Sequence, residues 1–104
     1  MLKLLQSEET RQMLADIYHY SEKNWGAKKA ALYLNELLDA FHMLAKNPQL
    51  GYSHPDFHTR YRLHPVARHR VIYRFNKDIL FIVAVLHESM DIDKRIATLT
   101  ETYH

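Results

Sequence analysis

The chain has 104 residues, of which 47% are apolar and 25% charged, and it contains only two glycines and three prolines. This length and composition exclude a disordered chain and suit one domain with one hydrophobic core, so we treat residues 1–104 as a single domain. The chain has no cysteine, which excludes disulfides, thiolate metal sites and thiol nucleophiles. The longest apolar run, at 79–86, is too short to cross a membrane. A cytoplasmic protein is expected.

The first half of the chain predicts a short strand followed by two helices. Residues 2–5 are suited to the strand, and Ser7 is a suitable N-cap for an amphipathic helix that ends near Gly26. Apolar residues then recur at helical spacing over 27–45, and Pro48 sets the stop. Because the link at Gly26 is so short, the two helices are expected to form a hairpin.

The second half of the chain changes from helical to alternating periodicity. Residues 49–59 are predicted to form a loop. Polar and apolar residues alternate over 60–63, and they alternate again over 69–75. We expect both segments to be strands, with Pro65 interrupting the pattern between them.

The last part of the chain completes the sheet. Residues 76–78 are suited to a hairpin turn, and the run at 79–86 is apolar on both faces, as a central strand would be. A short C-terminal helix is expected over about 91–99. The predicted order is β-α-α-β-β-β, an α+β fold.

The net charge is only +2, but basic residues concentrate in one segment. No acidic residue lies between Asp56 and Asp78, while the segment holds Arg60, Arg62, Arg68, Arg70, Arg74 and Lys77. Taken singly, the arginines that alternate with apolar residues are predicted to lie on the solvated face of a half-buried sheet. As a group they repel one another unless an anion lies near. An acidic protein segment or a nucleic acid would relieve that repulsion, and the sequence does not choose between them.

The eight histidines do not predict a metal site. His54 and His58 lie in a predicted loop around Pro55, and no His-Glu-x-x-His pattern is present. His87 ends the apolar strand, where it could transfer protons or hydrogen-bond the following turn at 89–91. No cofactor and no metal are expected.

Aromatic residues on the two predicted helices suggest a second kind of site. Tyr18, Tyr20, Trp25 and Tyr33 could form an aromatic partner surface. Tyr18 shares a helix face with Leu14, which favours a position in the core. For Trp25 the sequence does not choose between the core and a partner surface. No serine lies in a nucleophile motif and no glycine-rich phosphate loop occurs, so no catalytic residue is expected.

Several segments, taken in order, resemble the ParE toxins of type II toxin–antitoxin systems. The resemblance rests on Asp-Ile-Tyr-His-Tyr-Ser-Glu at 16–22, Trp-Gly at 25–26, Ala30, Tyr33, Leu-Ala-Lys-Asn-Pro at 44–48, Gly51, Tyr-Arg at 61–62, His-Arg-Val-Ile-Tyr-Arg at 69–74 and Val-Leu-His-Glu-Ser-Met-Asp at 85–91. The last segment, directly after an apolar strand, is the most specific.

The resemblance implies a RelE-like fold, in which an N-terminal strand and a helical hairpin pack on a small antiparallel sheet. It also implies a toxin that inhibits DNA gyrase, a topoisomerase, by protein–protein binding and that is neutralised by its antitoxin. The partner contacts expected on that basis are Arg60, Arg62, Arg68, Arg70, Arg74, His87 and Met90.

The alternative within the same superfamily is a RelE-like, ribosome-dependent endoribonuclease, with direct contact to nucleic acid. Arg70 occupies the strand position where such enzymes carry an arginine. However, His87 is followed by Glu88, which would repel a phosphate, and Tyr103 lies too far along the chain to serve as their terminal tyrosine. A third interpretation is a degenerate member that only binds its antitoxin.

Overall fold

The computed structural model describes residues 1–53, 61–90, 94–95 and 98 of the chain. The elements follow in the order β1 (Lys3–Gln6), α1 (Glu8–Trp25), α2 (Ala27–Lys46), β2 (Tyr61–Val66), β3 (His69–Phe75) and β4 (Ile79–His87). The expected α+β class and element order are therefore confirmed. Lys94, Arg95 and Thr98 have helical backbone, but the rest of the predicted C-terminal helix lies outside the described residues.

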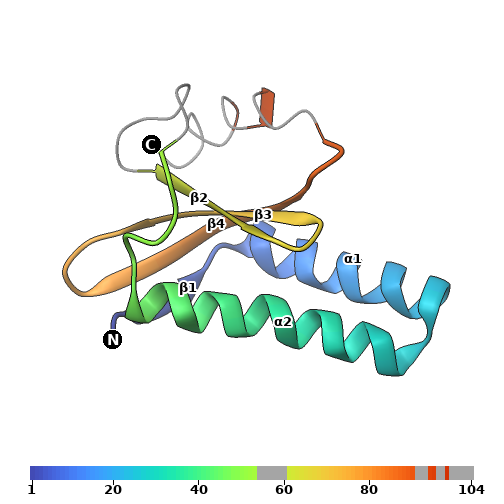
Figure 1. The fold of residues 1–104 in the computed structure, drawn as a ribbon. Helices are drawn as coiled ribbons and strands as arrows, with labels where there is room; N and C mark the ends of the chain where they lie inside the picture. The colour runs from blue at the N-terminus through green and yellow to red at the C-terminus, as the bar shows by residue number, and fades with distance from the viewer. Residues whose placement is uncertain (54–60, 91–93, 96–97, 99–104) are drawn as a thin grey trace.

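The four strands form one sheet in the order β1-β4-β3-β2. Strands β2, β3 and β4 are antiparallel, as expected, while β1 joins β4 in parallel, so that the complete sheet is mixed. Both helices lie on one side of the sheet, and the turn that joins them projects past its end (Figure 1). None of the described helices is long and apolar enough to cross a membrane.

Local signals in the sequence set the ends of the helices. The Ser7 side chain accepts a hydrogen bond from the backbone N–H of Thr10 and caps α1. Gly26, between the helices, has φ 91°, a left-handed conformation that favours glycine. Asn47 ends α2 directly before Pro48. These three predictions are confirmed.

The hairpin turn between β3 and β4 also forms as predicted. Asn76 Oδ1 accepts hydrogen bonds of 2.8 Å from the backbone N–H groups of Asp78 and Ile79, which closes an Asx turn. Strand β4 then lies between β1 and β3, and its residues from Ile82 to Leu86 are buried, as expected for a central strand.

The main hydrophobic core lies between the helices and the sheet. Its buried residues include Leu14, Leu37, Phe41, Leu44, Val66, Val71, Tyr73, Leu80, Ile82 and Val85. A second buried cluster comprises Tyr61, Leu63, Ile72, Val83, Ala84 and Leu86. Strand residues Ile72 and Tyr73 are neighbours in sequence but belong to different clusters, because successive side chains point to opposite faces of a sheet. Both faces of the sheet therefore carry buried side chains.

The prediction that Pro65 interrupts the strand pattern is wrong. Pro65 lies inside β2 and pairs with Arg70 of β3. Strand β2 is at the edge of the sheet, where a missing N–H group can face away from the ladder at no cost in hydrogen bonding.

Candidate protein-binding groove

A groove of about 710 Å³ opens where the helical hairpin meets the end of the sheet. Four parts of the fold contribute to it: α1, the start of α2, the β2–β3 turn together with the first residue of β3, and the end of β4. Its lining residues are Asp16, Ile17, Tyr20, Ser21, Trp25, Lys29, Tyr33, Ala67, Arg68, His69 and His87. We call it the aromatic groove.

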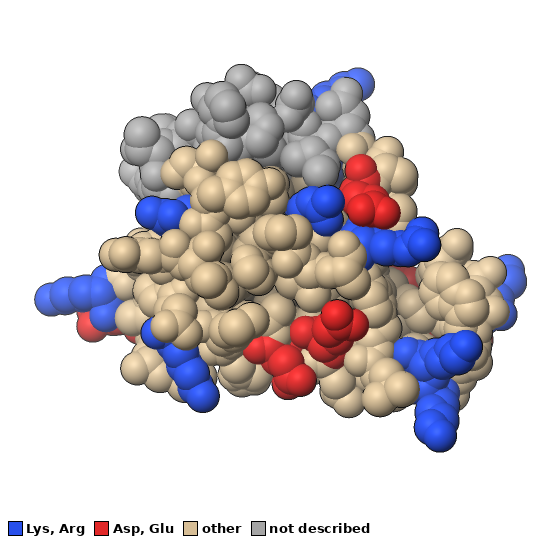
Figure 2. All heavy atoms as spheres, viewed as in Figure 1, with Lys and Arg blue, Asp and Glu red and all other residues tan. Residues whose placement is uncertain are grey.

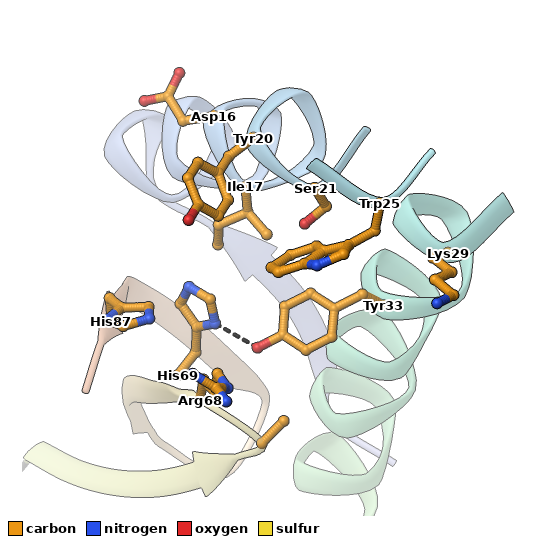
Figure 3. A pocket seen from close by; sticks show the side chains of 11 residues that line it. Asp16, Ile17, Tyr20, Ser21, Trp25, Lys29, Tyr33, Arg68, His69 and His87 are labelled. Atoms are coloured by element: carbon orange, nitrogen blue, oxygen red, sulfur yellow. Dashed lines mark hydrogen bonds between the residues drawn. The ribbon is translucent and has the colours of Figure 1, made fainter. Parts of the chain in front are cut away.

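The aromatic side chains give the groove its apolar character. Tyr20 and Trp25 are 63% and 55% exposed, and their rings meet edge to face with centroids 5.7 Å apart. Tyr33 lies beside the Trp25 indole and reaches the groove from α2 (Figure 3). Large aromatic side chains left open to solvent in a concave site are typical anchors for a protein partner. The structure thus places Trp25 at the surface.

The floor of the groove holds a contact between α2 and the sheet. The phenol oxygen of Tyr33 hydrogen-bonds Nδ1 of His69 at 2.5 Å (Figure 3). His69 is 8% exposed, and its ring meets that of His87 perpendicularly, with centroids 5.2 Å apart. Burial, followed by the nearby His87, lowers the pKa of His69 to about 4. Burial also raises the pKa of Tyr33, so both groups are uncharged at neutral pH.

Charged groups surround the groove with both signs. Lys29 supplies a positive charge from α2 and Arg68 one from the β2–β3 turn, while Asp16 supplies a carboxylate from α1. On the described part of the face in Figure 2, acidic side chains lie in the middle of the helical region and basic ones lie toward both ends. This face of the molecule is therefore not uniformly basic.

Comparison with known proteins decides the family. The family described as "ParE toxin of type II toxin-antitoxin system, parDE" matches residues 4–92. The chain belongs to the ParE toxin family. The match includes every residue that lines the aromatic groove, and it confirms the resemblance seen in the sequence.

Individual ParE proteins agree with this assignment. The chain is similar to "Toxin ParE1" of Caulobacter vibrioides, with 35% identity over 85 residues, which is 82% of this chain and 88% of that protein. It is also similar to "Toxin ParE1" of Mycobacterium tuberculosis, with 30% identity over 95 residues, 90% of this chain and 97% of that protein. A solved structure, "Chromosomal ParDE TA system from P. aeruginosa", superposes with a TM-score of 0.72 at 16% identity, covering 84% of this chain and 96% of that one. This last likeness shows the fold alone.

Within this ParE fold, the predicted contact residues do not share one face. Arg62 pairs with Tyr73 across the β2–β3 ladder, and residues opposite each other in a sheet point to the same side. Arg62 therefore lies on the helix side, where it donates a hydrogen bond of 2.7 Å to the carbonyl oxygen of Gly51. The expectation that Arg62 shares a solvated face with Arg70 and Arg74 is wrong. Arg60 lies outside the described residues.

Arg70 and Arg74 lie on the sheet face away from the helices. The guanidinium of Arg74 is 5.2 Å from the ring centroid of Phe81 and 5.9 Å from that of Tyr61. Arg70 lies 3.7 Å from the carboxylate of Glu88. The acidic residue that follows His87 thus offsets part of the positive charge of the strand arginines.

His87 makes the local contact that the sequence suggested as one of two possibilities. Its Nδ1 lies 2.7 Å from the Ser89 hydroxyl and accepts a hydrogen bond of 3.0 Å from the Ser89 backbone N–H. Met90 is 40% exposed, just beyond this turn. Among the described residues, no group of three or more His, Cys, Asp or Glu side chains could hold a metal ion.

Sequence reasoning found only part of the ParE groove. Tyr20, Trp25, Tyr33, Arg68 and His87 were named as candidates for partner contact. Lys29 and His69 were not. A basic residue directly after the helix turn and a histidine that opens a strand are common features, and nothing local to them shows that the fold brings them together.

Proposed function

We propose that this ParE-family toxin acts by protein–protein binding, inhibiting DNA gyrase, and that an antitoxin neutralises it by occupying the aromatic groove. The observation that carries the proposal is the exposure of Tyr20 and Trp25 in a concave site built from four segments. A partner that covers this surface removes apolar area from water, and the burial of that area favours binding. The likeness to proteins named ParE supports the toxin role.

The groove suits an amphipathic segment of the antitoxin. A volume of about 710 Å³ accommodates several apolar side chains. Lys29 and Arg68 would meet acidic residues of the segment, and Asp16 would meet a basic one. This arrangement of charges gives the partner one preferred direction along the groove.

The target contacts are proposed on the sheet and the turn that follows it. Arg70 and Arg74 on the face away from the helices, Arg68 in the β2–β3 turn, and His87 and Met90 after β4 are the described candidates for binding gyrase. Arg62 and Arg60 complete the set proposed from the sequence. We assign no catalytic residue to the protein.

Three observations weigh against the ribonuclease alternative. Catalysis of RNA cleavage requires unpaired cationic groups for the scissile phosphate and a group that moves protons. Arg70 is paired with the carboxylate of Glu88, and the Nδ1 atom of His87 is hydrogen-bonded to Ser89. His69, with a pKa of about 4, is a weak base.

Induction of the chain in bacteria without antitoxin tests the toxin role. We expect cell filamentation and induction of the DNA-damage response, both suppressed when the antitoxin is co-expressed. Arrest of translation with cleaved messenger RNA would instead assign the protein to the ribonuclease branch. If neither phenotype develops although the protein accumulates, it is not an active toxin.

The groove is tested separately by antitoxin binding. We expect Trp25→Ala to weaken binding by about 2 kcal/mol or more, the size of a hot-spot loss. Leu32→Ala is the matched control, because Leu32 is 62% exposed on α2 and does not line the groove. Equal affinities of the two variants, measured by calorimetry, would place the antitoxin elsewhere.

A further inference from the structure

The two edges of the sheet differ in how their backbone groups are used. At the β2 edge, both the N–H and the C=O of Leu63 bond to Tyr52, at 2.8 and 3.0 Å. Pro65, two residues further along the same edge, has no N–H to offer. This edge is closed to another strand, as is usual for natural sheets.

The β1 edge is open. Lys3 and Ser7 donate their N–H groups to β4, at the carbonyl oxygens of Asp78 and Ile82, at 2.9 and 3.0 Å. Backbone groups alternate in direction along a strand, so the N–H and C=O groups of Leu4 and Gln6 point away from β4. Within the residues that the structure describes, none bonds these outward groups.

The C-terminal end of α2 covers only the beginning of this edge. The outward N–H of Leu2 donates to the carbonyl oxygen of Ala45 at 3.0 Å. From Leu4 onward the edge has no such cover within the described part of the chain. Strand β1 also leaves the exposed side chains of Lys3 and Leu5 on its face away from the helices, and Leu5 is 39% exposed.

A second hollow of about 390 Å³ begins at Gln6, the last residue of the edge. It lies between α1 and α2 and is lined mainly by apolar side chains, among them Leu14, Tyr18, Leu34 and Leu38. We call it the β1 hollow. An open strand edge beside an apolar hollow has the two parts needed for strand addition: backbone groups for affinity and a place for alternate side chains.

We propose that β1 is the docking edge for an extended segment of the antitoxin, which adds to the sheet as a fifth strand beside Leu4 and Gln6. Apolar side chains at alternate positions of that segment enter the β1 hollow, and an acidic side chain meets Lys3. The inference rests on the proposed function, since it assumes an antitoxin, but it concerns a surface separate from the aromatic groove.

A second copy of the chain fits this edge less well than a different partner. Two β1 strands together would supply outward groups from only Leu4 and Gln6 of each chain. They would also bring two Lys3 side chains into one ribbon, and residues 1–7 contain no carboxylate to offset them. A segment that carries an acidic residue removes this repulsion.

A matched pair of substitutions isolates the outward backbone group. Gln6→Pro removes the N–H that the added strand needs and spares the N–H groups that bond β4, whereas Gln6→Ala removes the side chain and keeps the N–H. We expect Gln6→Pro to weaken antitoxin binding at least tenfold relative to Gln6→Ala, measured by calorimetry on variants with matched circular dichroism. Equal affinities would overturn the strand addition. Failure of the wild-type chain to bind the antitoxin would instead overturn the proposed function.

Hydrogen exchange on the unaltered protein gives an independent test that needs no variant. We expect the amides of Leu4 and Gln6 to exchange rapidly in the toxin alone and to become protected in the complex. Unchanged exchange in the complex would contradict the proposal. Protection that grows with the concentration of the toxin alone would also contradict it, because the occupant would then be a second copy.

Discussion

The phenol oxygen of Tyr33 lies 2.5 Å from Nδ1 of His69 and joins α2 to the first residue of β3. This contact lies on the floor of the aromatic groove, between the helical hairpin and the end of the sheet (Figure 3). It therefore connects the stability of the fold to the shape of the proposed binding surface.

Removing the phenol oxygen should weaken this connection. We expect Tyr33→Phe to lower the free energy of unfolding by about 1 kcal/mol, the usual net value of one hydrogen bond, or more because His69 is left without its partner. Tyr18→Phe serves as the control, since the hydrogen bond of the Tyr18 hydroxyl to Glu22 is long, at 3.4 Å, and exposed. Urea denaturation measures both variants. Equal effects would show that the Tyr33 contact contributes nothing specific.

Burial of a neutral His69 predicts a pH dependence. Its pKa is about 4 in the folded chain, below the ordinary 6.5, so the unfolded chain binds more protons between these values. Stability should therefore rise with pH from about 4 to 6.5, and its loss on acidification should be on the order of 2–3 kcal/mol. Urea unfolding at a series of pH values measures this slope, and His69→Gln should flatten it. A slope that His69→Gln leaves unchanged would assign the effect to other groups.

Gly51 is expected to tolerate no side chain. A Cβ atom there would lie 2.6 Å from the Tyr73 hydroxyl and 2.9 Å from the carbonyl oxygen of Leu63. The same hydroxyl accepts from the Gly51 N–H and donates to the Pro48 carbonyl oxygen. We expect Gly51→Ala to cost roughly 1–3 kcal/mol through this overlap, measured by thermal or urea unfolding.

Gly26→Ala provides a comparison with a different cause. No described residue comes within 4 Å of a Cβ at Gly26, but its φ of 91° is unfavourable for other residues. Gly26→Ala should cost about 1–2 kcal/mol from backbone conformation alone. Removing the Tyr73 hydroxyl should change the effect of Gly51→Ala and leave that of Gly26→Ala unaltered. If the loss of the Tyr73 hydroxyl is additive with Gly51→Ala as well as with Gly26→Ala, the overlap at Gly51 is contradicted.

Ser7 links α1 to β4 and should be sensitive to truncation. Its hydroxyl caps the helix at the Thr10 N–H and lies 2.7 Å from the carbonyl oxygen of Val83. We expect Ser7→Ala to cost about 1–2 kcal/mol, at the upper end for a lost N-cap. Ser53→Ala, at an exposed position, should change stability by less than about 0.5 kcal/mol. Both are measured by chemical denaturation.

The features that the sequence predicted correctly depend on short stretches of chain. Ser7, Gly26, Asn47 and Asn76 each act on neighbouring backbone groups, so a few residues contain the whole signal. The helix ends and the β3–β4 turn could be predicted for that reason.

The features that the sequence missed depend on strand register. Alternation over 60–63 indicated that Tyr61 and Leu63 are buried, which is correct, but it could not show that they belong to the cluster opposite the helices. Arg62 was consequently assigned to the wrong face. The pairing of β2 with β3 determines the face on which each β2 residue lies. No short segment of the sequence specifies that pairing.

The aromatic groove was only partly predictable for the same reason. The sequence identified the aromatic residues of α1 and α2 as candidates for partner contact. It did not show that Tyr33 meets His69, because the two residues are 36 positions apart in the chain. Only the packing of the helical hairpin on the sheet brings them together, along with His87 from the end of β4.

A supercoiling assay with purified DNA gyrase tests the central claim most directly. We expect the chain to inhibit supercoiling, cleaved DNA to accumulate, and added antitoxin to restore gyrase activity. Full gyrase activity in the presence of the chain, together with cleavage of messenger RNA on ribosomes by the same preparation, would contradict inhibition of gyrase.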